Sequence, residues 1–277
     1  MTSPAELRGL ATTVAVEAGA FVLEALTRVR ASVDAKSSPT DLVTEMDVAA
    51  EALVVDRLLA ARPHDGVLGE EGASGAGTSG VRWIVDPIDG TTNYVYGLPA
   101  FAVSIAAEVD GTVVAGAVAV PMLGEVFSAA TGAGATCNDT PIRASSAVLD
   151  AARAAGADDD TLLARSLLAT GYAYDPARRG RQAAVIAALL PRVRDVRRMG
   201  AAAVDLCLVA AGRVDAFYEQ GLQPWDYAAG ALVAAEAGAL VTDLDGGAPS
   251  TSSVLAAAPD LHGPLRTLLL EAGARST

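Results

Sequence analysis

The segment from residue 83 to 93, Trp-Ile-Val-Asp-Pro-Ile-Asp-Gly-Thr-Thr-Asn, constrains the fold of this 277-residue chain more than any other. Its apolar start predicts a strand that delivers Asp86 at its C-terminal end, and Asp89 follows three residues later. Gly90 permits a close backbone approach, and residues 91–93 are typical of the first turn of a helix, whose free N–H groups can hold a phosphate. Two hard oxygen ligands beside such a helix end predict a magnesium–phosphate site.

Two further acidic segments could join this site, although each is also common in ordinary loops and helices. Residues 69–72, Gly-Glu-Glu-Gly, place Glu70 after a short strand, where a carboxylate can serve as a metal ligand or a base. The sequence Pro-Trp-Asp ending at Asp226 places a carboxylate in the first turn of a helix. Taken singly, these two segments are typical of an acidic surface turn and of a helix start, and residues 86–90 are typical of a tight turn.

Hydrophobic periodicity divides the chain into two parts, which we expect at residues 1–145, with Asp86 and Asp89, and at residues 146–277, with Asp226. The first part predicts two antiparallel helices, two strands and an antiparallel meander, at residues 3–29, 44–58, 66–69, 81–85, 101–109, 112–120 and 125–130. The second part alternates strands with helices, at residues 166–169, 179–190, 193–197, 201–211, 214–218, 225–237, 240–242, 254–257 and from 261. This alternation favours a layered α/β arrangement.

Charge and composition narrow the classes of partner. The formal net charge is −13, from 20 basic and 33 acidic residues, which argues against broad binding to nucleic acid or to an anionic membrane surface. The apolar stretches are rich in alanine and are interrupted by glycine or charge, so we expect no membrane-spanning segment. Two cysteines cannot build a disulfide framework, and the first residues lack the pattern of a signal peptide, so we expect a cytoplasmic protein.

Together these segments resemble the inositol monophosphatase family of magnesium-dependent, lithium-sensitive sugar-phosphate phosphatases. Five segments match in the family's order and with family-like spacing: Lys36-Ser-Ser-Pro-Thr-Asp-Leu-Val-Thr-Glu-Met-Asp47, Gly69-Glu-Glu-Gly72, Asp86-Pro-Ile-Asp-Gly-Thr91, Arg197-Arg-Met-Gly-Ala-Ala-Ala-Val-Asp-Leu206 and Trp225-Asp226. The five-part match is specific, and it is nearest to bacterial inositol-1-monophosphatases of actinobacterial type. The resemblance implies the family's αβαβα sandwich and a homodimer.

The resemblance also assigns roles to the acidic side chains. Glu70, Asp86 and the backbone carbonyl of Ile88 would bind a first Mg²⁺ ion. Asp86, Asp89 and Asp226 would hold a second. No Cys or Ser is placed to form a phosphoenzyme, so the expected reaction is direct attack of a metal-activated water on the phosphate ester.

Water activation and substrate contacts follow from the same resemblance. Thr91 and Asp47 would form a hydrogen-bonded pair that, with Glu70, orients and activates the attacking water. The N–H groups of Gly90, Thr91 and Thr92 would bind the phosphate. The inositol hydroxyls would contact Gly200, Ala202, Glu219 and Asp226. Arg197 would contact the substrate or a partner subunit, and Lys36 would help to place a weaker third metal.

Three of these positions could instead have ordinary structural roles. Asp47 could complete a capping box with Thr44 at a helix start. Arg197 could be an exposed basic residue, and Glu219 could be a surface residue at the end of a strand. Many family members carry Ser or Thr where this chain has Ala201, which affects substrate preference or a helix cap rather than metal binding.

The implied reaction is hydrolysis of myo-inositol 1-phosphate to inositol and phosphate, with two or three Mg²⁺ ions. The same chemistry on histidinol phosphate, fructose 1,6-bisphosphate or a 3′-phosphoadenosine nucleotide is the nearest alternative. A catalytically silent binding protein on the same fold is an alternative from a different class.

Overall fold

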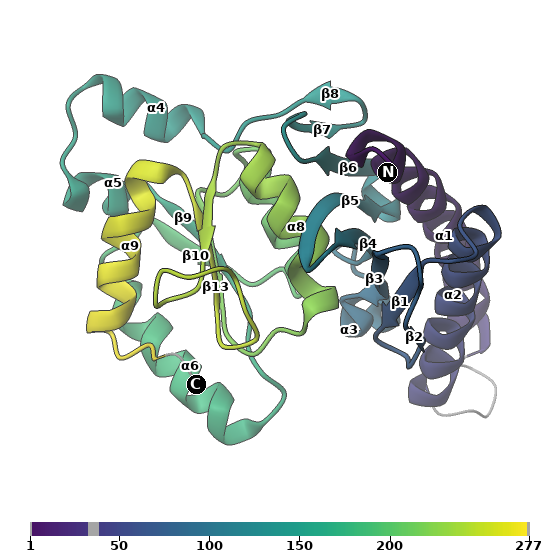
Figure 1. Cartoon of the computed structure of the whole chain (residues 1–277). Helices are drawn as coiled ribbons and strands as arrows, with labels where there is room; N and C mark the ends of the chain where they lie inside the picture. The colour runs from purple at the N-terminus through teal and green to yellow at the C-terminus, as the bar shows by residue number, and fades with distance from the viewer. Residues whose placement is uncertain (1, 33–38, 276–277) are drawn as a thin grey trace.

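Five layers of helices and sheets make up the molecule, and they confirm the expected αβαβα sandwich (Figure 1). The computed structural model describes the backbone of residues 2–32 and 39–275 and, outside residues 27–44, their side chains. From one side to the other, the layers are a helix pair, an eight-stranded sheet, a second helix pair, a five-stranded sheet and an outer set of helices. The helices of these layers are, in that order, α1 (Pro4–Ser32) and α2 (Pro39–Ala61); α7 (Ala202–Ala210) and α8 (Pro224–Glu236); and α4 (Ala147–Ala154), α5 (Asp159–Arg165), α6 (Pro176–Leu189) and α9 (Pro259–Glu271).

The eight-stranded sheet has the order β2-β1-β3-β4-β5-β6-β7-β8. β1 and β3 are parallel, and the other neighbours are antiparallel, which confirms the predicted meander. The strands are β1 (Gly66–Gly69), β2 (Ser74–Gly75), β3 (Val81–Asp89), β4 (Ala102–Val109), β5 (Thr112–Val120), β6 (Glu125–Ala130), β7 (Ala135–Cys137) and β8 (Thr140–Pro141). Two short helices accompany it, α3 (Thr91–Tyr96) and the 3₁₀ turn η1 (Pro121–Leu123).

The five-stranded sheet has the order β10-β9-β11-β13-β12. β9 lies parallel to both β10 and β11, whereas β13 lies antiparallel to β11 and β12. Its strands are β9 (Leu167–Thr170), β10 (Asp195–Arg197), β11 (Ala216–Glu219), β12 (Leu240–Thr242) and β13 (Val254–Ala257). The carboxyl ends of parallel strands meet at one edge of a sheet, so β9 and β11 end side by side.

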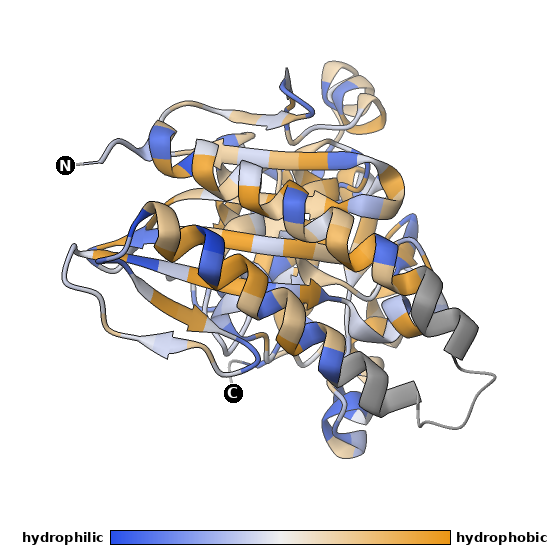
Figure 2. Cartoon of the chain, turned by 90° about the vertical axis from the view of Figure 1, so that its right-hand side faces the viewer, coloured by the Kyte–Doolittle hydropathy of each residue, from blue (hydrophilic) through white to orange (hydrophobic). Residues whose placement is uncertain are grey.

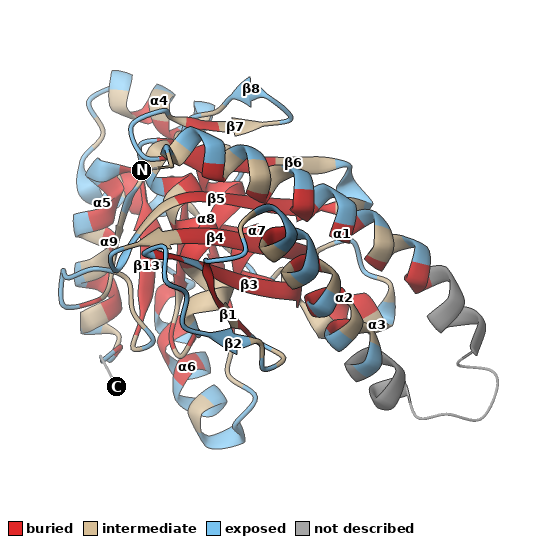
Figure 3. Ribbon diagram, turned by 45° about the vertical axis from the view of Figure 1, so that its right-hand side comes forward, coloured by how far each residue is buried: buried red, intermediate tan, exposed pale blue. Residues whose placement is uncertain are grey.

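Small side chains let the middle helices lie close to the first sheet. β4 and β5 are buried over most of their length (Figure 3), because helices cover both faces of the sheet. A Cβ atom built on Gly116 in β5 would lie 3.1 Å from the Cα atom of Ala229 in α8. Any side chain larger than hydrogen at position 116 would therefore force this layer outward.

The helix α1 corrects one expectation from the sequence. Its residues Pro4–Leu26 are long and apolar enough to cross a membrane by length and composition, although we expected glycine or charge to prevent this. Leu7, Ala11, Val14 and Ala18 are nevertheless buried against the first sheet. Hydrophobic and hydrophilic residues alternate along α1 and α2 in Figure 2. The apolar character of α1 is thus accounted for by its packing on the sheet.

Two element boundaries differ from the sequence prediction. α2 begins at Pro39 rather than at residue 44, because proline suits the first helical turn, where its missing N–H would have no helical partner. Asp47 therefore lies inside the helix, and the alternative that it caps a helix start is wrong. β3 does not stop at Asp86 but continues to Asp89.

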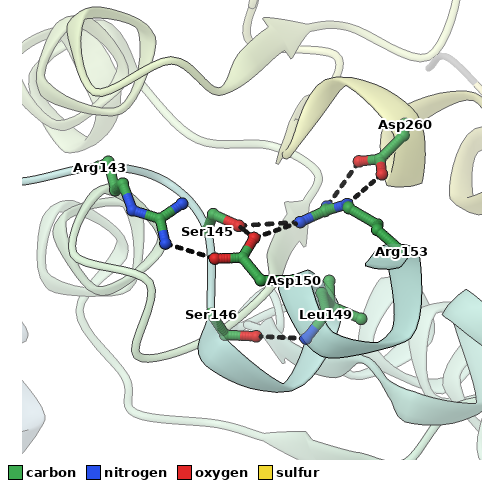
Figure 4. A network of polar contacts seen from close by, with 7 residues as sticks. All are labelled: Arg143, Ser145, Ser146, Leu149, Asp150, Arg153 and Asp260. Atoms are coloured by element: carbon green, nitrogen blue, oxygen red, sulfur yellow. Dashed lines mark hydrogen bonds and ion pairs between the residues drawn. The ribbon is translucent and has the colours of Figure 1, made fainter. Parts of the chain in front are cut away.

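The sequence prediction missed α4 and α5, which follow the expected boundary near residue 145. Each begins at a residue whose side chain accepts a backbone N–H bond, Ser146 and Asp158 respectively. Arg153 in α4 then donates to Asp150 at 3.0 Å and to Asp260 in α9 at 2.6 Å (Figure 4). The pair with Asp260 joins α4 to α9 within the outer helix layer.

Candidate active site

A pocket of about 280 Å³ lies at the carboxyl ends of β1, β3, β9 and β11. Three helices, α3, α7 and α8, begin at its wall, so their N-terminal partial positive charges all lie beside it. The predicted residues that line it are Glu70, Asp86, Ile88, Asp89, Gly90, Thr91, Gly200, Ala202, Glu219 and Asp226. Lys36 lies outside the described residues, and Asp47, Thr92 and Arg197 do not line the pocket.

Asp86 and Asp89 come from an irregular end of β3. The pairing of β3 with β4 shifts register between these residues, as at a β-bulge, and both side chains line the pocket. Asp86 is 1% exposed, and its Oδ1 atom accepts a hydrogen bond of 3.0 Å from the backbone N–H of Ile88. Burial, and then the charge of Asp89, raise the pKa of Asp86 well above its ordinary value. A cation bound between the two carboxylates would relieve this repulsion.

Asp89 also connects the first sheet to the middle helix layer. Helix α7 begins after Ala201, which has no side-chain oxygen to cap it. The Oδ2 atom of Asp89 instead accepts a hydrogen bond of 2.7 Å from the backbone N–H of Ala203 in the first turn of α7. The absence of a hydroxyl group at position 201 is therefore compensated by a carboxylate from another element.

Glu70 follows β1 directly, and a buried residue of α2 holds its turn in place. The two carboxylate oxygens of Glu51 accept hydrogen bonds from the backbone N–H groups of Glu71 at 2.9 Å and Ala73 at 2.8 Å. Gly69 leaves the space that the Glu51 carboxylate occupies, since a Cβ atom at position 69 would lie 2.1 Å from it. Glu51 therefore fixes the backbone on the C-terminal side of Glu70.

The carboxyl group of Glu70 lies among other acids. The loss of solvent around the carboxyl group of Glu70 raises its pKa to about 7, and the charges of Asp226, Glu71 and Glu51 add to the rise. A hydrogen bond with Asp86 opposes this rise. The residue as a whole is exposed at the pocket rim.

Asp226 reaches the pocket from the first turn of α8. Its Oδ2 atom accepts a hydrogen bond of 2.7 Å from the backbone N–H of Gln223, and the two residues form a reciprocal capping box. Burial raises the pKa of Asp226 to about 6, and this hydrogen bond opposes the rise. The carboxylate of Asp226 thus has two roles, because it caps the start of α8 and also lines the pocket.

The N-terminal end of α3 is free of any side-chain cap. Gly90, at a φ of 87°, precedes the helix, and among the described side chains none caps its first N–H groups. A Cβ atom at Gly90 would lie 2.9 Å from the carbonyl oxygen of Ala100, so both the conformation and the space require glycine. The amide groups of Thr91 and Thr92 are therefore available to an anion.

The structure does not form the expected hydrogen bond between Thr91 and Asp47. The hydroxyl group of Thr91 donates instead to the carbonyl oxygen of Ile88, an acceptor within its own turn, at 3.1 Å. Asp47 is 5% exposed in α2, and burial followed by the charges of Glu71 and Glu70 raises its pKa to about 8. Asp47 thus faces the acidic cluster without joining Thr91.

The opposite wall of the pocket carries Glu219, Gly200 and Ala202. Burial raises the pKa of Glu219 to about 7, and the neighbouring Arg198 opposes the rise. Arg197, which the resemblance assigns to contact with the substrate or a partner subunit, does not line the pocket, and its guanidinium pairs with Asp195 at 2.6 Å. Its contact with a partner subunit stays a prediction.

Sequence reasoning missed several residues of this second wall. Arg198 lines the pocket where Arg197 was expected, because adjacent residues of an extended segment point in opposite directions. Gly171, Tyr172 and Tyr174 follow β9, and no local motif marks them. The sequence indicated Arg198 only through its position next to Arg197, and two adjacent arginines do not show which of them faces the pocket.

The acidic side chains fit a divalent cation by the chemistry of their donors. Glu70, Asp86, Asp89 and Asp226 offer hard oxygen atoms in one pocket, and within the described residues none pairs with Lys or Arg. Burial raises the pKa values of all four, and for Glu70, Asp86 and Asp89 the charges of neighbouring carboxylates raise them further, so a bound cation would favour their ionised forms. In the same part of the chain, no group of three or more His, Cys, Asp or Glu side chains is already arranged to hold a metal ion. Cation binding would therefore exchange their present hydrogen bonds for coordination.

Comparison with known proteins agrees with this fold. A sequence model described as "Inositol monophosphatase family" matches residues 3–274. The inositol-1-monophosphatase SuhB of Mycobacterium tuberculosis is 49% identical over 96% of this chain and 94% of its own, and the solved Mycobacterium tuberculosis SuhB superposes with a TM-score of 0.82, at 44% identity and 99% coverage of both chains. The Nus factor SuhB of Salmonella typhimurium is 41% identical over 75% of this chain and 73% of its own. The chain therefore belongs to the inositol monophosphatase family, a family of phosphatases.

Proposed function

We propose that the chain is a magnesium-dependent phosphatase that hydrolyses myo-inositol 1-phosphate to inositol and phosphate. One observation carries the proposal: four carboxylates with raised pKa values share a single pocket with the uncapped N-terminal end of α3. The carboxylates suit divalent cations, and the helix end suits a phosphate. Neither feature alone would distinguish a phosphatase from another metal-binding protein.

Metal binding would fall to the acidic residues of the pocket. Glu70, Asp86, Asp89, Asp226 and the carbonyl of Ile88 would hold two Mg²⁺ ions, and a third would depend on the Lys36 loop. Bound Mg²⁺ would supply neutralisation of the phosphate charge and activation of water.

The first N–H groups of α3, at Thr91 and Thr92, would bind phosphate oxygens, because no carbonyl inside the helix can accept from them. Glu70 and the hydroxyl group of Thr91 would orient the attacking water, with Asp47 contributing negative charge from behind. Glu219 would accept hydrogen bonds from the ring hydroxyls, beside Gly200 and Ala202.

Phosphate release from four substrates, with and without Mg²⁺, tests this proposal. The substrates are myo-inositol 1-phosphate, histidinol phosphate, fructose 1,6-bisphosphate and 3′-phosphoadenosine 5′-phosphate. We expect Mg²⁺-dependent release with the highest kcat/KM for inositol phosphate. A higher kcat/KM for another substrate would keep the chemistry and reject the substrate assignment.

A binding role without catalysis is the second candidate, because one relative is named a Nus factor. The net charge of −13 makes nucleic acid a poor direct partner, so such a role would use protein contacts. No release from any of the four substrates in the presence of Mg²⁺ would favour this candidate.

We further propose that the chain acts as a cytoplasmic homodimer, that lithium inhibits it, and that residues 1–145 and 146–277 are its two structural parts. The pocket takes Glu70, Asp86 and Asp89 from the first part and Glu219 and Asp226 from the second, so both would be needed for activity. Light scattering of the purified protein and a lithium titration of the assay test the first and second statements.

A further inference from the structure

We propose that Arg198 is a specificity-determining residue that binds substrate hydroxyl groups opposite Glu219. The inference rests on the proposed phosphatase function and adds a residue to the substrate side of the same pocket. It concerns how the part of the substrate away from the phosphate is recognised.

Arg198 is placed at the pocket wall with its hydrogen-bond donors unused. It lines the pocket, and within the described part of the chain its guanidinium forms no hydrogen bond or ion pair. The neighbouring Arg197 is paired with Asp195 at 2.6 Å, so the two arginines have different surroundings. A guanidinium has five N–H donors and no acceptor, so Arg198 offers these donors to whatever enters.

Glycine residues leave the space that the charged groups of this wall occupy. A Cβ atom on Gly200 would lie 2.4 Å from the Nη1 atom of Arg198. A Cβ atom on Gly171 would lie 2.0 Å from the Oε2 atom of Glu219. The guanidinium and the carboxylate therefore lie folded against the backbone at two points of one pocket wall.

The pairing of a donor group with an acceptor group suits hydroxyls better than a second phosphate. A hydroxyl group accepts one hydrogen bond and donates another, so neighbouring ring hydroxyls can use both Arg198 and Glu219. A second anion at this position would meet the carboxylate of Glu219, which lines the same wall as Arg198. The phosphate has its own place at the α3 end of the pocket.

Steady-state kinetics with two substrates tests the inference. Myo-inositol 1-phosphate carries ring hydroxyls, whereas p-nitrophenyl phosphate carries none. For Arg198→Met we expect KM for inositol phosphate to rise about tenfold with kcat within about twofold, and kcat/KM for p-nitrophenyl phosphate to stay within about twofold. Arg194→Met, an exposed arginine outside the pocket, is the matched control and should change neither substrate.

The outcomes separate this inference from the proposed function. An equal loss of kcat/KM for both substrates would show that Arg198 acts on the phosphate or by general charge. Unchanged kcat/KM for both substrates would show that it is a surface residue. Either result overturns the inference. Turnover of the two substrates by the unmodified protein reports on the proposed function alone. Arg198→Lys keeps the charge without the planar fork, so recovery of less than half of the lost affinity supports hydroxyl recognition, and full recovery contradicts it.

Discussion

The two walls of the pocket are built in different ways. The wall that we propose binds metal, here called the metal wall, comprises Glu70, Asp86, Asp89 and Thr91, which all fall within residues 69–91, and Asp226 at the start of α8 completes it. The substrate wall comprises Gly171, Arg198, Gly200 and Glu219, which fall between residues 171 and 219 in separate parts of the second half of the chain. Most of the metal wall comes from the ends of β1 and β3 and the start of α3, which lie close together in the sequence, whereas the substrate wall is assembled by tertiary packing from separate segments.

The walls also differ in charge. The metal wall consists of carboxylates that repel one another and whose pKa values are raised by burial. The substrate wall mixes the carboxylate of Glu219 with the guanidinium of Arg198. We therefore expect substitutions in the metal wall to abolish cation binding and turnover, and substitutions in the substrate wall to change mainly KM.

The largest expected effect comes from Asp86→Asn in the metal wall. Activity should fall by at least about 10³-fold, since a bound metal ion contributes several kcal/mol to the stabilisation of transition-state charge. The melting temperature of the metal-free protein should stay equal or rise, because a buried, repelled carboxylate is removed. Phosphate release and thermal melting measure the two effects. The exposed Asp245→Asn is the control, and retained activity in Asp86→Asn would refute the assignment of the metal wall.

The hydrogen bonds that hold the turn after Glu70 can be weakened without substituting any proposed metal ligand. Glu51→Gln keeps the size of the side chain but can accept only one of the two backbone hydrogen bonds that hold the Glu71–Ala73 turn. We expect Mg²⁺ affinity, measured by calorimetry, to weaken by about 10- to 100-fold, as for other residues that orient metal ligands. Glu45→Gln, an exposed change in the same helix, should leave affinity unaltered. Unchanged affinity in Glu51→Gln would restrict Glu51 to a structural role.

The substrate wall should respond differently to Glu219→Gln. The amide retains one acceptor oxygen but loses the charge, so KM for inositol phosphate should rise by about tenfold. Mg²⁺ affinity should change by less than about threefold, because Glu219 belongs to the opposite wall. A loss of Mg²⁺ binding as large as that of Asp86→Asn would break the distinction between the walls.

The smallest expected effect is a pH dependence of stability in the metal-free protein. Folding raises the pKa of Glu70 from 4.5 to about 7 and that of Asp226 from 3.8 to about 6, so the folded state binds more protons than the unfolded state. Stability should therefore fall as pH rises from about 4 to about 7 and then level off with respect to these two groups. We expect the melting temperature to be a few degrees higher at pH 5 than at pH 8.

Added Mg²⁺ should reverse this trend at pH 8, because the cation binds the ionised carboxylates of the folded state. Melting curves at both pH values, with Mg²⁺ and with a chelator, provide the measurement. A metal-free protein that is more stable at pH 8 would indicate that the carboxylates are not short of positive charge.

Sequence periodicity predicted most strands and helices, apart from α4 and α5, and the motif at residues 83–93 predicted a site at Asp86 and Asp89. The αβαβα order of the layers and the roles of Glu70 and Asp226 came from the resemblance to a family. The apolar run into Asp86 and the Gly90 turn are local, and they predict a strand, a pair of acids and a helix start without reference to the rest of the chain. The β-bulge that extends β3 to Asp89 depends on pairing with β4, so the sequence alone places the strand end too early.

The substrate wall was only partly predictable for a related reason. Glu219 and Gly200 were placed by resemblance to a family, and the same resemblance selected Arg197 instead of Arg198. The Nη1 atom of Arg198 lies where a Cβ atom on Gly200 would be, so the glycine two residues later leaves the space for Arg198, but the pair of arginines alone does not show this. The hydrogen bond of Thr91 to the carbonyl of Ile88 was also not predicted.

One carboxylate, that of Asp89, serves two neighbours in this architecture. One of its oxygens receives the amide of Ala203, and the other is left for the pocket. Removing the whole side chain would take away a proposed metal ligand and would also leave the N-terminal end of α7 without its bond to the first sheet. A variant that loses activity at this position must therefore be examined for displacement of α7 as well as for loss of metal binding.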